Sequence, residues 1–169
     1  MAIAVFQPSE YNGAGETETA NVSSFNVGSV DSANITPGPA NAITAGNNAY
    51  IKYHKWKCTT FSTLNQISDL RVWKSAGAYN TGVGIQCSAR TSAYTQPVYA
   101  TPVATTYTDQ TLPVADPGAA NLGIATSLSG TITALNQYSD RFKWQLQTTG
   151  STPAGTLNTL TFTFQWLEQ

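Results

Sequence analysis

Residues Thr159 to Trp166 read Thr-Leu-Thr-Phe-Thr-Phe-Gln-Trp and alternate between polar and apolar side chains at every position. Successive side chains of a β-strand point to opposite faces, so this segment is expected to form a strand with one aromatic face and one hydroxyl-rich face. The aromatic face carries Leu160, Phe162, Phe164 and Trp166. A face of this kind needs a second layer to cover it, which predicts a sandwich or a barrel.

Several other segments follow the same two-residue period less regularly. Residues 141–147 and 81–87 are expected to form strands, and residues 70–74 a shorter one. Their inward positions are expected to be Phe142, Trp144 and Leu146 in the first, Val83, Ile85 and Cys87 in the second, and Leu70 with Val72 in the third. Residues 23–30 and 127–135 are weaker candidates for strands.

A long strand is predicted between Asn48 and Thr60, where both alternating frames contain apolar residues. A β-bulge inserts one extra residue and re-aims the side chains that follow it. A bulge near His54 would place Ile51 and Tyr53 on the same face as Trp56, and we adopt it as the expectation.

Long helices are not expected, because Thr and Gly are dense and no helical apolar period is found. Turn-rich connections at residues 36–41, 116–123 and 149–155 separate the expected strands, and residues 94–114 are predicted to be edge strand and loop. The fold class predicted is all-β: an antiparallel β-sandwich of jelly-roll or immunoglobulin-like type, formed by residues 20–169 as a single domain.

Residues 1–19 differ from the rest, since they contain three glutamates and no basic residue. They are predicted to form an extended N-terminal arm outside the core. A frayed terminus without a role is the alternative left open.

Composition limits the function. Only 10% of the residues are charged, against a usual share of about 25%. The net charge of −1 and the pI near 5.7 disfavour a nucleic-acid partner bound through a basic surface. No signal peptide and no membrane-spanning apolar run is found, so no membrane partner is expected, and the chain is predicted to be made in a cytosol. Cys58 and Cys87 are then expected to be reduced, with a disulfide as the alternative.

No constellation for catalysis stands out. His54, the single histidine, is expected to be a half-exposed strand residue, and Cys58 lies about 13 Å further along a regular strand, too far to pair with it. The acidic residues fall mainly in expected turns, where a solvated side chain or a cap is the simplest interpretation. The cysteines and the histidine do not make a zinc set, and no phosphate-binding glycine motif is present. We therefore expect no enzyme activity, no metal and no cofactor.

Residues 53–73, Tyr-His-Lys-Trp-Lys-Cys-Thr-Thr-Phe-Ser-Thr-Leu-Asn-Gln-Ile-Ser-Asp-Leu-Arg-Val-Trp, resemble small virion proteins of tailed bacteriophages. The segments 138–146 and 152–157 are similar to the same group. The resemblance implies a β-sandwich without catalytic residues, made in the host cytoplasm and placed on the capsid surface as a decoration (cement) protein. It implies the major capsid protein and neighbouring copies as partners, and by analogy leaves a homotrimer open.

The predicted partner contacts lie in the expected arm and in the lysine-rich strand. They are Phe6, Tyr11, Glu16, Glu18, Lys52, Lys55 and Lys57. The lysines are either a solvated strand face or a surface for an acidic partner, including the acidic arm of a neighbouring copy. Two other functions remain: a carbohydrate-binding module of a tail or adhesin, with Tyr79, Tyr94, Tyr99 and Tyr107 as exposed aromatics, and a small hydrolase with a site built from scattered acids.

Overall fold

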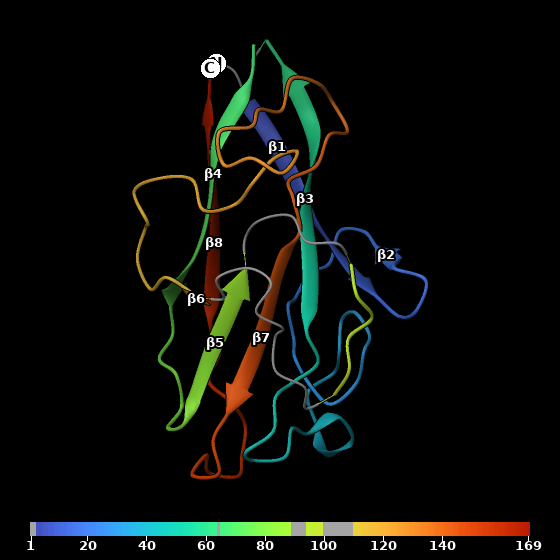
Figure 1. The fold of residues 1–169 in the computed structure, drawn as a ribbon, viewed down its shortest axis with the longest axis vertical. Coiled ribbons are helices and arrows are strands. Elements are labelled where there is room, and N and C mark those ends of the chain that lie inside the picture. Colours follow the sequence, from blue (N-terminus) through green and yellow to red (C-terminus); the bar gives the residue numbers. More distant parts are fainter. Residues whose placement is uncertain (1–2, 64, 89–93, 100–109) are drawn as a thin grey trace.

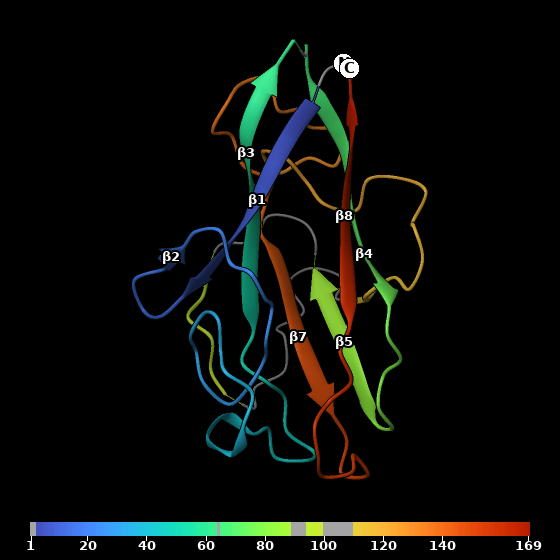
Figure 2. The same ribbon diagram turned by 180° about the vertical axis from the view of Figure 1, so that it is seen from behind.

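The computed structural model describes residues 3–63, 65–88, 94–99 and 110–169. Within these residues, eight strands form two antiparallel sheets. The strands are β1 (Ile3–Asn12), β2 (Thr17–Thr19), β3 (Lys52–Ser62), β4 (Ile67–Ala76), β5 (Val83–Ser88), β6 (Gln110–Thr111), β7 (Phe142–Thr148) and β8 (Thr161–Glu168). One short 3-10 helix, Pro39–Asn41, lies in the connection between β2 and β3. Figures 1 and 2 show the elongated molecule from its two sides, with the start of β1 and the end of β8 at the same end.

The larger sheet has the strand order β2-β1-β3-β7-β5-β6, and β4 pairs with β8 to form the smaller one. Aromatic side chains fill the space between the sheets. The ring of Trp56 on β3 stacks on Phe164 of β8 with centroids 4.6 Å apart, and Trp144 on β7 meets Phe162 of β8 at 5.2 Å. The sandwich predicted from the final strand is therefore confirmed, with Phe162, Phe164 and Trp166 packed against the core.

The segment after β6 joins the edges of the two sheets. The amide of Leu112 donates to the carbonyl of Ile85 on β5, and the carbonyl of the next residue, Pro113, accepts from the amide of Lys74 on β4. Neighbouring residues of one segment thus hydrogen-bond to different sheets. This fixes the distance between the sheets along that side of the molecule.

A side chain continues the pairing along β4. The Asn121 side chain accepts a hydrogen bond from the amide of Val72 and donates one to the carbonyl of the same residue, both at 2.8 Å. An amide side chain presents the same donor and acceptor as a backbone peptide. Asn121 therefore covers part of the β4 edge, which would otherwise expose unpaired backbone groups.

The N-terminal segment is part of the sheet, and the prediction of an arm outside the core is wrong for β1. This strand pairs with β3 from Ile3 to Tyr11, and Ala4, Ser9, Glu10 and Tyr11 are buried. The ring of Phe6 contacts Phe164 and Trp166 of β8. β1 thus belongs to one sheet and packs on the other.

The long strand β3 lacks the bulge predicted near His54. The register instead shifts where Val5 pairs with Thr60 and Phe6 pairs with Cys58, so that Thr59 is the extra residue. Ile51 and Tyr53 do not share a face with Trp56. They belong to a separate apolar cluster with Tyr11, against which Tyr94 packs. Both alternating frames of β3 contain apolar residues because both faces of this strand are covered.

The remaining strand predictions are confirmed with small changes of boundary. β7 and β5 carry their predicted inward residues, and β4 is longer than predicted and contains Leu70 and Val72 in its buried face. Residues 23–30 and 127–135 form no strand. Cys58 and Cys87 are buried and in the thiol form, as expected.

Candidate functional site

The ionisable residues of β3 lie on both faces of the strand. Lys52 and His54 point to the interior of the sandwich, whereas Lys55 and Lys57 lie on the outer face of the six-stranded sheet. The two sets have different partners and are described in turn.

The interior set is a buried ion pair. Lys52 Nζ lies 2.5 Å from Glu10 Oε1, and it donates a second hydrogen bond to the carbonyl of Ser32 at 2.7 Å. The exposed fractions of the two charged side chains are 2% and 0%. Burial alone would raise the pKa of Glu10, but the neighbouring His54 and the positive charge of Lys52 outweigh it, and the pKa lies below its ordinary value. The prediction of Lys52 as a partner contact does not fit this position.

His54 is completely buried beside this pair, so the expectation of a half-exposed residue is wrong. The indole N–H of Trp144 lies 3.0 Å from His54 Nδ1. Because an indole nitrogen can only donate, Nδ1 must accept, and the neutral imidazole carries its proton on Nε2. Nε2 faces Glu10 Oε2 at 3.5 Å. The ring of Phe25 covers the imidazole with a centroid distance of 3.9 Å.

These contacts make the interior set a closed, neutral unit. One carboxylate, one ammonium and one neutral imidazole sum to zero charge, and the side chains of Glu10 and His54 have no exposed surface. A buried charge is tolerated when it is paired and hydrogen-bonded. We therefore assign this cluster to the structure of β1 and β3 rather than to chemistry on a substrate.

The outer set gathers around Tyr138, and we call it the Tyr138 face. It comprises Tyr11, Glu16, Glu18, Lys55, Lys57, Tyr138 and Arg141. Lys55 Nζ lies 5.0 Å from the ring centroid of Tyr11 and 5.6 Å from that of Tyr138, and Lys57 Nζ lies 5.6 Å from Tyr138. An ammonium group at this distance from an aromatic face is attracted by the ring quadrupole.

The two acidic residues of this face have partners from the same chain. Arg141 Nε donates to Glu16 Oε1 at 2.8 Å. Glu18 pairs with Tyr11 across the β1–β2 register. Burial, reinforced by the negative charge of Glu18, raises the pKa of Tyr11. The acidic segment therefore folds back on its own sheet.

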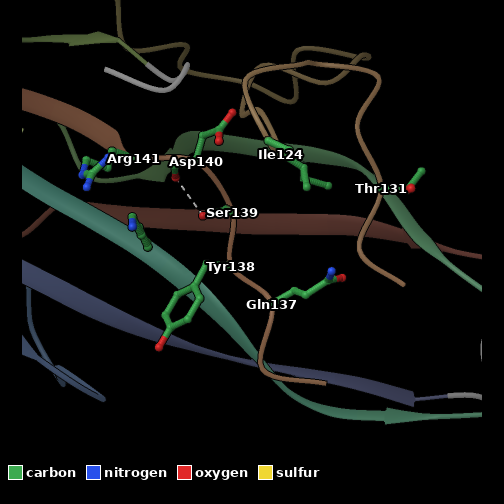
Figure 3. Close-up of a pocket in the computed structure, with 9 residues that line it drawn as sticks. Ile124, Thr131, Gln137, Tyr138, Ser139, Asp140 and Arg141 are labelled. Carbon is green, nitrogen blue, oxygen red and sulfur yellow. Dashed lines mark hydrogen bonds between the residues drawn. The ribbon is translucent and has the colours of Figure 1, made fainter. Parts of the chain in front are cut away.

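Tyr138 and Arg141 are placed by an irregular segment that continues β7 along β3. The amide of Ser139 donates to the carbonyl of Trp56, and the Ser139 hydroxyl accepts from the amide of Trp56. Figure 3 shows this segment, with the Tyr138 ring projecting on the side away from Ile124. The side chains of the Tyr138 face thus rest on a sheet that is hydrogen-bonded on both sides of β3.

A depression of about 300 Å³ lies beside Lys55 and Tyr138 (Figure 3). Its other lining residues are mostly polar and come from the segments 124–131 and 137–141. Asp140 shapes one wall, because both of its carboxylate oxygens accept from the amide of Thr126. A Cβ on Gly123 would lie 2.2 Å from Asp140 Oδ2, so glycine is needed for this close approach.

The charged residues that line the depression are Lys55, Asp140 and Arg141. Burial lowers the pKa of Lys55, and the nearby positive charge of Arg141 lowers it further, against the opposing effect of Glu16 and Glu18. The groups around the Lys55 ammonium therefore do not fully compensate its positive charge.

Five of the seven predicted contact residues are brought together by the structure: Tyr11, Glu16, Glu18, Lys55 and Lys57. Phe6 and Lys52 lie elsewhere, Phe6 against β8 and Lys52 inside the sandwich. The sequence prediction missed Tyr138 and Arg141. The signal for them is their position directly before the alternating strand β7.

The remaining points raised by the sequence are metal binding, membrane spans and exposed tyrosines. Within the described ranges, no group of three His, Cys, Asp or Glu side chains lies close enough to hold a metal ion, and no helix is long and apolar enough to cross a bilayer. Tyr79, Tyr94 and Tyr99 are half-buried, and Tyr99 stacks on Tyr50. Tyr107 lies outside the described residues.

Comparisons with models of protein families, with curated proteins and with solved structures found no match to this chain.

Proposed function

We propose that this chain is a non-enzymatic structural protein of a tailed-bacteriophage virion, which decorates the capsid by binding the major capsid protein through the Tyr138 face. The observation that carries this proposal is the convergence of charged and aromatic side chains from β1, β2, β3 and the segment before β7 on one sheet surface. Tyr and Arg side chains are enriched at protein-binding surfaces and among the residues that contribute most to binding.

Two further properties of the chain support a role in a repeated assembly. The chain is rich in short side chains such as Thr and Ser, which lose little conformational entropy when an interface orders them. Many copies on a lattice multiply a modest single contact, because each bound copy raises the effective concentration of the next site in a multivalent array.

The test uses particles and the recombinant chain. Quantitative mass spectrometry of purified virions is expected to give a copy number that scales with the number of capsid subunits. The recombinant chain is expected to co-sediment with capsids that lack it. Absence from purified capsids, or a copy number typical of a tail tip, would overturn the proposal.

A carbohydrate-binding role is the second candidate, favoured by the polar depression that Tyr138 helps to line. Sugar sites combine an aromatic surface with a few polar groups that fix orientation, and Thr131, Gln137 and Lys55 line this depression. Specific binding of the full chain on a glycan array, lost in Tyr138→Ala, would favour this function over decoration.

A further inference from the structure

Two lysines on the Tyr138 face lack an acidic partner in the part of the chain that the structure describes. Salt bridges there involve Lys52, Arg71 and Arg141, whereas no carboxylate lies within 4 Å of Lys55 or Lys57. Two carboxylates act on Lys55 from this face: Glu16, which is bound by Arg141, and Glu18, which lies opposite Tyr11 in the β1–β2 register.

The two ammonium groups are held in a defined geometry. Lys55 and Lys57 are two residues apart on one face of β3, so their Cα atoms are separated by about 7 Å. Both Nζ atoms lie 5.6 Å from the centroid of the same ring, Tyr138. Cation–π contacts restrict the long side chains before any ligand arrives, which lowers the entropy lost on binding.

We propose that Lys55 and Lys57, positioned over Tyr138, bind the carboxylate of an acidic side chain that projects from a partner protein. The inference rests on the proposed function, in which this face meets a capsid protein. One carboxylate placed between two ammonium groups completes the charge of each with charge-assisted hydrogen bonds. The depression beside Lys55 leaves room for neighbouring atoms of the partner.

The surrounding charges select the class of partner. Glu16, Glu18 and Asp140 all act on Lys55 with negative charge. They would repel the closely spaced phosphates of a nucleic acid, which need a continuous basic surface. A protein surface of mixed charge, with one acidic side chain opposite the lysine pair, meets less of this repulsion than a row of phosphates does.

A second copy of this chain is a poorer source of the carboxylate. Its acidic N-terminal segment is folded into its own sheet, with Glu16 bound to Arg141. Presenting that segment to a neighbour would break these contacts.

The first arm of the test measures binding of the full chain to a blocked peptide that carries one glutamate among neutral residues, by NMR chemical-shift titration at low salt, with the same peptide carrying glutamine instead as ligand control. The variant Lys55→Gln/Lys57→Gln is expected to bind the glutamate peptide about tenfold more weakly, the sum of two exposed charge contacts. Arg71→Gln removes one positive charge from the other sheet and is expected to change affinity less than about twofold. Lys55→Arg/Lys57→Arg keeps both charges and should retain binding. Thermal melting checks that each variant is folded.

Several outcomes would overturn the site. They are equal losses for the double glutamine variant and Arg71→Gln, an unchanged affinity in the double variant, or tighter lysine-dependent binding of a DNA duplex than of the peptide. Single variants at Lys55 and Lys57 keep the test decisive if the double variant fails to fold.

The second arm repeats capsid co-sedimentation with the same variants. Loss of co-sedimentation in the double variant alone supports the site in its proposed setting. If peptide binding fails, the carboxylate site is overturned whatever the capsid result. If wild-type chain binds the peptide but not capsids, the proposed function is overturned and the site stands.

Discussion

His54 is held neutral by its burial and by the hydrogen bond that its Nδ1 accepts from Trp144. Burial lowers its pKa below 6.5, and Glu10 opposes this only in part. The indole N–H of Trp144 points at Nδ1. Protonation of His54 would add a hydrogen to Nδ1, where it would face the indole N–H of Trp144. The ring therefore cannot become charged without losing the Trp144 hydrogen bond.

A pH dependence of stability follows. The unfolded chain binds a proton at His54 near pH 6.5, while the folded chain does not bind it until a lower pH. The free energy of unfolding should therefore fall as the pH drops below about 6.5, by at most about 1.4 kcal/mol per pH unit. A further loss begins below about pH 4.5, because the pKa of Glu10 is also lowered in the folded state.

Urea unfolding between pH 7.5 and 5.5 measures the first of these losses. The chain has a single histidine, so the variant His54→Asn removes this titration. Its side-chain oxygen offers Trp144 an acceptor near the position of Nδ1. The variant is expected to be less stable at pH 7.5 but nearly insensitive to pH down to 5.5. An unchanged slope in the variant would show that other groups cause the dependence.

The Glu10–Lys52 pair should show strong coupling between its members. Glu10→Gln leaves the buried Lys52 ammonium without a counter-charge and is expected to cost about 3–5 kcal/mol. Glu10→Gln/Lys52→Met removes the orphaned charge as well, and is expected to be more stable than Glu10→Gln alone. Denaturant unfolding at pH 7.5 gives both values. Additive losses would indicate that the two groups do not act as a pair.

β1 pairs with the larger sheet and contacts the smaller one, although its sequence does not clearly indicate a strand. Its outward residues Ile3 and Val5 are exposed, whereas Phe6 contacts the aromatic side of β8. Phe6→Ala is expected to destabilise the protein by about 2–3 kcal/mol, at or below the usual range for a core phenylalanine because the site is partly buried. The matched change Val5→Ala on the outer face should cost less than about 0.5 kcal/mol. Equal effects, measured by urea unfolding, would mean that β1 does not link the sheets.

A strand could be predicted from the sequence where it has a single apolar face. β8 has one, so its period of two was sufficient to predict the strand and its inward residues, although the strand begins and ends two residues later than the predicted segment 159–166. β3 is covered on both faces, which removes the alternation and led to a bulge predicted at His54 instead of Thr59. β1 was missed because Glu10, an inward residue, becomes acceptable there only through Lys52 on the neighbouring strand.

Most residues of the Tyr138 face could be predicted as contacts from the sequence, but not that they lie together on one surface. Tyr11, Glu16, Lys55 and other members were predicted as contacts from their charge and sequence clustering. Their meeting point depends on the pairing of β1 with β2 and β3. Tyr138 joins them through the backbone pairing of its segment with β3, which leaves no periodic signal in the sequence.

At the scale of the whole molecule, the aromatic layer makes the two sheets interdependent. Phe162 of β8 contacts Phe142 and Trp144 of β7 as well as Phe25 from the connection between β2 and β3. β4 and β8 pair only with each other as strands, and a two-stranded sheet is marginal by itself. The smaller sheet is therefore expected to fold only together with the larger one.

The four tryptophans test this expectation, since Trp56 and Trp144 belong to the larger sheet and Trp73 and Trp166 to the smaller. Fluorine NMR of the protein labelled with fluorotryptophan is expected to show all four native resonances disappearing at one urea midpoint. Phe162→Ala, which removes a ring shared by both sheets, should lower that midpoint for all four together, at a cost of about 2–4 kcal/mol. Earlier loss of the Trp73 and Trp166 signals would instead mean that the smaller sheet unfolds separately, and that the rings between the sheets contribute less than their contacts indicate.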